Sequence, residues 1–181
     1  MTFSYRPEIH IVFRMNSREV ILEHCQNALV AYRNGMKEKS KAFGLVFGTV
    51  SDQVITVDNC FPLQKNLRSE APYKKYMDKM MAEHAIPSQT PLDQRGWVAD
   101  PAELFTRIKE CRKSNQILLG TYHMHRVGWE HDTRRDTPTT LDAVLARKSE
   151  MVMFIVSMVD PKRPILRAFF EGIEEQEIPI Q

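Results

Sequence analysis

The chain has 181 residues, of which 43% are apolar and 27% charged, and its formal net charge is +2. This length suits a single domain with a hydrophobic core, and the near-neutral charge excludes nucleic acid or a membrane surface as the main partner. Three scattered cysteines without a CxxC spacing exclude a disulfide framework or a cysteine-based zinc site, so we expect Cys25, Cys60 and Cys111 to be buried free thiols.

The first elements predicted are a strand and a long helix. Residues 8–13 alternate in polarity and are rich in β-branched side chains, which indicates a strand. Apolar residues then recur at helical spacing up to Asn34, where Asn34-Gly35 ends the helix. Asn16 and Glu19 have the spacing of a capping box at its start.

Two apolar strands and an irregular segment follow. Residues 42–50 and 53–63 are expected to pair as antiparallel strands joined by the turn at Ser51-Asp52. Residues 64–96 are polar and irregular apart from a short helix at 73–84, and we expect a surface insertion there.

The second half of the chain continues the mixture of helices and strands. Asp100 as N-cap and Pro101 at the first helical position begin a helix over 100–114. The remaining predicted elements are a strand at 116–125, a polar loop at 126–138, a helix from Thr139, and strands at 151–159 and 164–172. This order predicts a mixed α/β fold with a central sheet. The absence of a signal-peptide pattern and of a membrane-length apolar run predicts a cytoplasmic protein.

The strand that ends in "GTYHMH" carries two histidines two residues apart. Side chains at i and i+2 lie on the same face of a strand, so His123 and His125 would stand side by side. Two neighbouring imidazoles are costly to bury without a partner, and a metal ion is one partner that takes both lone pairs. A hydrolytic zinc site typically has three protein ligands, so the next element would have to supply one more.

Asp136 and Asp142 are the candidates for that third ligand, since each lies three residues after a threonine. A helix capped by Thr133 would place Pro138 at its fifth position, where it removes a backbone hydrogen bond and clashes. A helix capped by Thr139 leaves Pro138 outside and makes Asp142 the capping-box partner. Helix capping therefore favours Asp142, with Asp136 as the alternative.

These motifs resemble the JAMM/MPN+ (JAB/Mov34-type) zinc metallopeptidases, and the chain is similar to a divergent bacterial-type member. "GTYHMH" followed by "PTTLD" is similar to the family's His-x-His strand and the Ser/Thr-x-x-Asp that opens a helix. "AFGLVFG", "CFPLQKN", "DPAEL" and "MFIVSM" resemble its flanking segments in the same order, over most of residues 8–172. The resemblance implies one MPN-type (cytidine-deaminase-like) α/β domain over residues 1–181, with a curved mixed sheet flanked by helices and an insertion at 64–96.

The resemblance also implies a function and a set of roles. It implies zinc-dependent hydrolysis of isopeptide or peptide bonds next to ubiquitin-like or sulfur-carrier-like tails, with a protein or peptide as partner. His123, His125 and Asp142 would ligate Zn²⁺, and Thr139 would orient the site or stabilise the tetrahedral intermediate. In the family a glutamate is the general base, which fits the need for a carboxylate that moves protons from water to the leaving amine.

Lys41 stands where the family has this glutamate, three residues before Gly44. A lysine does not accept a proton from water unless its pKa is strongly lowered. Glu38 is the carboxylate nearest in the sequence and the first candidate for the general base. Glu130, in the loop after the histidines, is the second.

The loop after the histidines departs from the family pattern as well. Arg126 replaces a usual proline, and Thr139 falls six residues later than the family norm, whereas Thr133 and Asp136 lie at the usual distance. Trp129 within this polar loop indicates either contact with a peptide tail or packing as a lid. Two alternatives remain open. Lys41 in place of the glutamate allows a pseudo-enzyme that acts as a protein-binding module, and the enlarged loop allows a metal hydrolase with a different small substrate.

Overall fold

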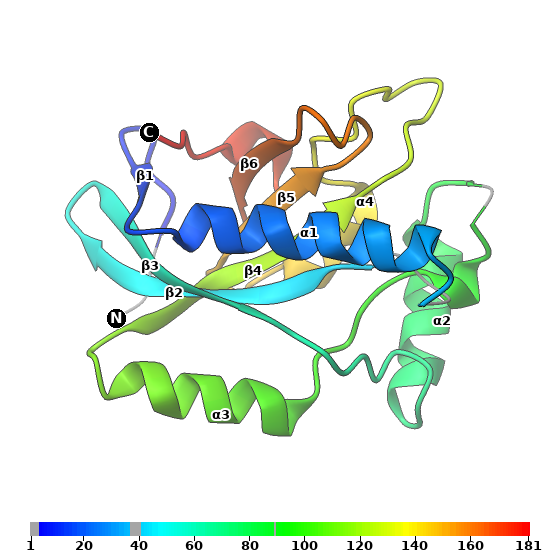
Figure 1. The fold of residues 1–181 in the computed structure, drawn as a ribbon, viewed down its shortest axis with the longest axis horizontal. Helices are drawn as coiled ribbons and strands as arrows, with labels where there is room; N and C mark the ends of the chain where they lie inside the picture. Colours follow the sequence, from blue (N-terminus) through cyan, green and yellow to red (C-terminus); the bar gives the residue numbers. More distant parts are fainter. Residues whose placement is uncertain (1–3, 37–40, 89) are drawn as a thin grey trace.

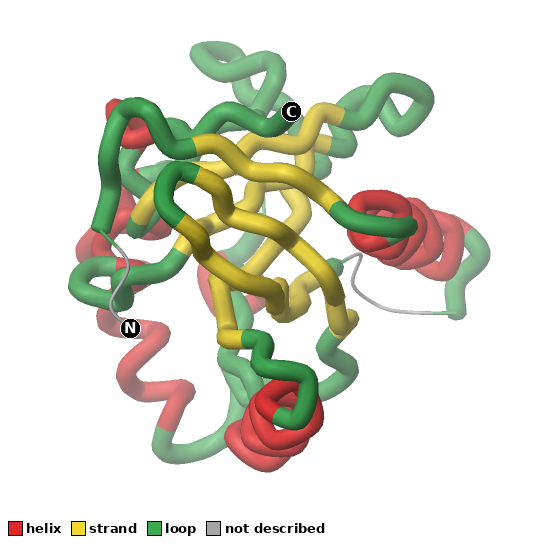
Figure 2. Tube along the Cα trace, turned by 90° about the vertical axis from the view of Figure 1, so that its left-hand side faces the viewer, coloured by secondary structure: helices red, strands yellow, loops and turns green. Residues whose placement is uncertain are grey.

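A six-stranded mixed sheet forms the centre of the protein, in the order β1-β3-β2-β4-β5-β6. A computed structural model describes residues 4–36, 41–88 and 90–181. The β1–β3 and β4–β5 pairs are parallel, and the other neighbouring pairs are antiparallel. The strands are β1 (His10–Phe13), β2 (Phe43–Ser51), β3 (Val54–Pro62), β4 (Ile117–His125), β5 (Val152–Ser157) and β6 (Ile165–Phe170). Figure 2 shows the sheet curled between the helices.

The helices lie on both faces of this sheet, with α1 along one side and α3 along the other (Figure 1). They are α1 (Ser17–Arg33), α2 (Tyr73–His84), α3 (Pro101–Arg112) and α4 (Thr140–Ala146), with short 3-10 turns η1 (Leu92–Gln94) and η2 (Glu174–Gln176). Among the described helices, none combines the length and the apolar character that a membrane span requires.

Strand β2 is covered on both faces of the sheet, which explains why its sequence is a nearly continuous apolar run. Val46 packs with Ile21 and the other buried residues beneath α1, whereas Leu45 and Phe47 pack with Cys111 on the α3 side. Successive side chains of a strand point to opposite faces, so a strand covered on both faces is apolar at every position. This double cover confirms the expected α/β sheet flanked by helices.

Strand β4 is oriented by a tyrosine that fills the α1 side of the core. Tyr122 is fully buried, pairs across the sheet with Gly44, and its hydroxyl lies 2.7 Å from Nδ1 of His24. A Cβ atom at Gly44 would lie 2.2 Å from Cε1 of the Tyr122 ring, so only glycine fits there. Because Tyr122 faces α1, the neighbouring His123 faces the other side of the sheet.

The predicted order of elements is confirmed, but the predicted capping box of Asn16 at the start of α1 is wrong. Asp100 caps α3, because its carboxylate accepts a hydrogen bond of 2.8 Å from the amide of Ala102. Asn16 precedes α1, but its side chain makes no capping hydrogen bond. Its φ of −103° and ψ of 22° differ from the extended backbone of an N-cap. Ser17 bonds backward instead, through a hydroxyl that donates to the Arg14 carbonyl at 2.7 Å. The three cysteines are free and buried, as expected.

Segment 64–96 folds around a buried arginine. The Arg68 side chain donates to the carbonyl of Arg95 at 2.8 Å and to Asp78 of α2 at 2.7 Å. Met77 and Met81 on α2 are buried. The short helix predicted at 73–84 is thus present as α2, and that this segment is an insertion in a single domain stays a prediction.

Candidate metal centre

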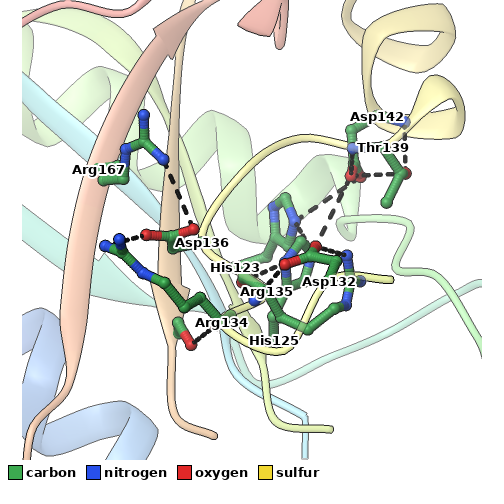
Figure 3. A network of polar contacts seen from close by, with 10 residues as sticks. His123, His125, Asp132, Arg134, Arg135, Asp136, Thr139, Asp142 and Arg167 are labelled. Atoms are coloured by element: carbon green, nitrogen blue, oxygen red, sulfur yellow. Dashed lines mark hydrogen bonds and ion pairs between the residues drawn. The ribbon is translucent and has the colours of Figure 1, made fainter. Parts of the chain in front are cut away.

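The two histidines at the end of β4 face one another, as the alternation of the strand predicts. Their ring centroids are 4.8 Å apart, and Nε2 of His123 lies 3.0 Å from Nε2 of His125. Both rings lie on the side of the sheet opposite α1, and Figure 3 shows them pointing toward the same space. Two ring nitrogens therefore converge on a single point.

A backbone carbonyl fixes the protonation pattern of His125. Its Nδ1 lies 3.0 Å from the carbonyl oxygen of Arg135, in the loop after β4. A carbonyl only accepts hydrogen bonds, so Nδ1 carries the proton and Nε2 presents its lone pair. Metal-binding histidines are commonly oriented by such a second hydrogen bond.

The start of α4 supplies the third group of the cluster. Thr139 caps the helix and forms a capping box with Asp142, as predicted. Oδ1 of Asp142 lies 3.6 Å from Nε2 of His123, and Oδ2 lies 3.9 Å from Nε2 of His125. One ligand atom from each of the three residues can be chosen so that all lie within 4.8 Å of one another.

The electrostatics of the cluster suit a divalent cation. Burial lowers the pKa of both His123 and His125, and for His125 the neighbouring imidazole lowers it further. Both imidazoles are therefore neutral at neutral pH, which is the form that binds a metal ion. Burial also disfavours charge on Asp142, yet its pKa lies below the usual value, because attraction to the two histidines in their protonated form and hydrogen bonds from Thr139 favour the carboxylate.

Two nitrogens and one carboxylate form a donor set that zinc uses in hydrolytic sites. Ligands of a tetrahedral zinc ion, each about 2.0–2.1 Å from it, lie roughly 3.3 Å from one another. The two imidazole nitrogens lie 3.0 Å apart, and each lies within 4 Å of one carboxylate oxygen of Asp142, at 3.6 Å from Oδ1 for His123 and 3.9 Å from Oδ2 for His125. With one ligand atom taken from each residue, the three atoms lie within 4.8 Å of one another, so small side-chain shifts would bring them to zinc-binding distances. The residues present therefore fit a zinc ion.

Asp136 points away from the histidines. Its buried carboxylate lies 2.6 Å from Nη2 of Arg134, as an ion pair without hydrogen-bond geometry, and 3.5 Å from Nη1 of Arg167 on β6. Figure 3 shows Asp136 on the β6 side of the loop and Asp142 on the α4 side. The structure thus brings Asp142, and not Asp136, to the imidazoles.

A cavity of about 630 Å³ opens over the cluster. One wall comes from α2 and the segment after it, including Met77, Met81 and Arg95, and another comes from α4 and the residues after it. Trp97 also lines the cavity, and its ring stacks on that of Phe43 with 5.7 Å between the ring centroids. Segment 64–96 therefore contributes directly to the space above the candidate ligands.

Of the two candidate general bases, only Glu130 lies within the described residues, and it is not part of this cluster. Glu38 falls outside the described residues, and Glu130 is exposed and does not line the cavity. Lys41 does line it, and its Nζ donates to the carbonyl of Gly96 at 2.9 Å. Among the described lining residues, Asp142 is the only carboxylate.

Arg135 is a site residue that sequence reasoning missed. It is buried, its guanidinium carbon lies 3.5 Å from the centre of the Trp129 ring, and its Nη1 lies 3.2 Å from Asp132. One feature of the sequence could have pointed to Arg135. Trp129 is an unusual residue for a polar loop, and an arginine six residues later can stack on its ring. Trp129 lines the cavity together with Arg135.

The curled mixed sheet and the His-His-Asp cluster define an MPN-type α/β protein. A profile of the JAB1/Mov34/MPN/PAD-1 ubiquitin protease family matches residues 16–153, so the chain belongs to this family. The solution structure of protein DSY2949 from Desulfitobacterium hafniense is similar, with a TM-score of 0.62 and 23% sequence identity over 94% of this chain and 91% of that chain. At that identity the likeness shows the fold alone. No functionally curated protein matches the sequence.

Proposed function

We propose that this protein is a zinc-dependent hydrolase of peptide or isopeptide bonds. The observation that supports this most directly is the convergence of His123, His125 and Asp142 beneath a cavity, in a chain of the JAB/MPN family. The family name denotes a ubiquitin protease, so the proposed substrate is a protein or peptide, with a ubiquitin-like or sulfur-carrier-like tail as the proposed class.

In this proposal His123, His125 and Asp142 hold the zinc ion. When bound, zinc polarises the substrate carbonyl and lowers the pKa of a water to about 7. The Arg135 carbonyl keeps the proton of His125 on Nδ1, so that Nε2 stays available. Thr139 holds the Asp142 carboxylate through its hydroxyl and its amide.

Glu38 is the first candidate for the general base. It lies three residues before Lys41, which lines the cavity. A general base must come within hydrogen-bond reach of the proton it takes. Glu130 is the second candidate, and its exposed side chain would have to turn toward the cavity.

Lys41 supports a second candidate function. An ammonium that donates to the Gly96 carbonyl stands where the family has its catalytic glutamate. A chain that keeps the metal ligands but lacks a base would act as an MPN-fold protein-binding module. The two proposals differ in one property, which is hydrolysis by the zinc-loaded protein.

Metal content is the decisive first measurement. Protein purified without added metal should contain about one zinc per chain, as determined by elemental analysis. His125→Ala and Asp142→Ala should lose the zinc, whereas His131→Ala, which removes an exposed histidine of the neighbouring loop, should keep it. Wild-type protein that takes up no zinc even when zinc is offered would contradict the hydrolase proposal.

Hydrolysis assays of the zinc-loaded protein then separate the two proposals. Loss of an effective general base reduces turnover about 10²–10⁴-fold. We expect a loss of this size for Glu38→Gln and not for Glu130→Gln when cleavage of a ubiquitin-like conjugate is measured. Zinc-loaded wild-type protein that cleaves no conjugate would favour the binding module.

A further inference from the structure

Four cationic side chains surround the cavity above the candidate metal centre. Among the described lining residues these are Lys41, Arg95, Arg126 and Arg135, against the single carboxylate of Asp142. One of the four, Arg135, pairs with Asp132, which lies outside the described lining, at 3.2 Å. The formal net charge of the whole chain is only +2, so positive side chains are concentrated here. A zinc ion on the cluster would increase the local positive charge further.

Two of these arginines have no carboxylate within ion-pair distance in the described part of the chain. Nη1 and Nη2 of Arg95 donate to the Ile86 carbonyl at 2.8 and 2.9 Å, and the Arg126 guanidinium lies 5.4 Å from the centre of the Tyr32 ring. A guanidinium has five N–H donors, so the Arg95 side chain keeps donors for another acceptor. Burial lowers the pKa of Arg95, and the positive charge of Arg135 lowers it further. A bound anion would relieve this repulsion.

The walls of the cavity indicate what kind of anion fits. Met77, Met81, Trp97 and Leu145 give it extensive apolar and aromatic lining. A cavity of about 630 Å³ is in the range of a small-molecule site, so it would hold a few residues of peptide. An apolar wall beside arginines suits a peptide carboxylate, which arginine binds in a planar, two-point geometry.

We propose that the cavity binds a carboxylate of the substrate beside the scissile amide, with Arg95 as its main partner and Arg126 in support. The inference rests on the proposed hydrolase function, which places the scissile bond at the His-His-Asp cluster. The carboxylate is either the C-terminal group of the leaving segment or an acidic side chain next to the bond. Segment 64–96, which supplies Arg95, would thereby select acidic substrates.

Three short peptides distinguish a C-terminal carboxylate from an acidic side chain as the bound group. They are acetyl-Phe-Glu-Gly-amide, the neutral acetyl-Phe-Gln-Gly-amide, and acetyl-Phe-Gln-Gly with a free C-terminal carboxylate. Calorimetric titration into the full chain, with and without zinc, should show at least one acidic peptide binding about tenfold or more tightly than the neutral one. The preference should shrink as the salt concentration rises.

Arginine variants test whether Arg95 and Arg126 cause the tighter binding of acidic peptides. Arg95→Gln should remove most of it, and Arg95→Lys should keep part of it, because the charge remains but the two-point geometry is lost. Arg163→Gln should leave it unchanged, since this exposed arginine pairs with Asp160 and does not line the cavity. If circular dichroism shows that Arg95→Gln is unfolded, Arg126→Gln decides, with an expected loss of at least threefold.

Several outcomes would overturn the inference. They are equal affinity for all three peptides, no binding of any peptide, a preference that survives in the folded arginine variants, and inorganic phosphate binding more tightly than the acidic peptides. The carboxylate site and the proposed hydrolase function can fail independently in these experiments. A protein that prefers acidic peptides but takes up no zinc contradicts only the hydrolase, whereas an active zinc enzyme without the preference contradicts only the carboxylate site.

Discussion

The hydroxyl of Thr139 donates a hydrogen bond of 2.7 Å to Oδ2 of Asp142, and the Thr139 amide donates a second one of 2.8 Å to the same oxygen. One threonine therefore both begins α4 and holds the carboxylate that faces His123 and His125. A helix cap and the orientation of a candidate metal ligand are thus the same set of contacts, which couples local folding to the site.

Thr139→Ala should weaken both properties. Loss of an N-cap costs about 1 kcal/mol of unfolding free energy, and loss of a contact that orients a ligand typically costs 10–100-fold in metal affinity. Urea unfolding measures the first and competition with a zinc chelator measures the second. Thr140→Ala, one residue further along and exposed, is the matched control. Unchanged zinc affinity in Thr139→Ala would show that the threonine acts only as a cap.

Asp136 is predicted to stabilise the loop beneath the site without binding metal. Asp136→Asn keeps the size of the side chain but removes the charge that pairs with Arg134 and Arg167. Because Arg134 is exposed and Arg167 keeps Glu177 at 2.6 Å, neither arginine is left buried alone. We therefore expect a loss of about 1–2 kcal/mol rather than the larger cost of an orphaned buried charge.

Urea unfolding and zinc content together test this prediction. Asp160→Asn, which removes an exposed carboxylate paired with Arg163, should change the unfolding free energy by less than about 0.5 kcal/mol. Asp136→Asn should still bind about one zinc per chain. If it loses zinc as completely as Asp142→Ala, Asp136 contributes to the metal site after all.

Local rules account for what could be predicted from the sequence. The two-residue period of β4 placed His123 and His125 on one face, and the position of Pro138 made Thr139 the helix cap, which selected Asp142 over Asp136. Each of these inferences depends on residues within a few positions of one another. Asn16 shows the limit even there, because the backbone before α1 leaves its side chain without a capping contact.

The remainder of the site depends on contacts distant in sequence. Arg95 lines the cavity from a segment in which Arg68 bonds both to the Arg95 carbonyl and to Asp78 of α2. The Arg135 carbonyl reaches His125 through an irregular loop in which Arg135 itself has a φ of 50°. No periodic pattern encodes such contacts, so the charged wall of the cavity could not be predicted from spacing.

The stability of the metal-free protein should depend on pH through the two histidines. Burial lowers the pKa of His123 and His125 in the folded state, so the unfolded chain takes up protons at a higher pH than the folded chain does. Their contribution is therefore fully present above about pH 6.5 and is lost as the pH falls from there toward the lowered folded-state values. We expect a loss of about 1–3 kcal/mol in unfolding free energy between pH 7.5 and 5.5.

Urea unfolding of chelator-treated protein at several pH values measures this loss. The double variant His123→Gln, His125→Gln should lose distinctly less over the same interval, whereas His131→Gln should behave as the wild type. An equal loss in the wild type and the double variant would mean that other groups cause the pH dependence.

Gly44→Ala should disturb the sheet next to the candidate ligands. The new Cβ would meet the ring of Tyr122 at 2.2 Å, and that ring is fully buried and bonded to His24. Overpacking of a well-filled core typically costs about 1–3 kcal/mol, and here we expect about 2–4 kcal/mol, because the overlap is severe and close packing limits how far a fully buried ring can shift. Since Phe43 pairs with His123 directly beside this contact, zinc affinity should fall as well.

A double-mutant cycle with Tyr122→Leu tests whether the clash is the cause. In the Tyr122→Leu background the ring is absent, so Gly44→Ala should cost at least 1 kcal/mol less than it does in the wild type. Both single variants and the double variant are compared by urea unfolding, and their zinc content is measured in parallel. Equal costs in the two backgrounds would place the constraint on Gly44 in its backbone rather than in the tyrosine that orients the histidine strand.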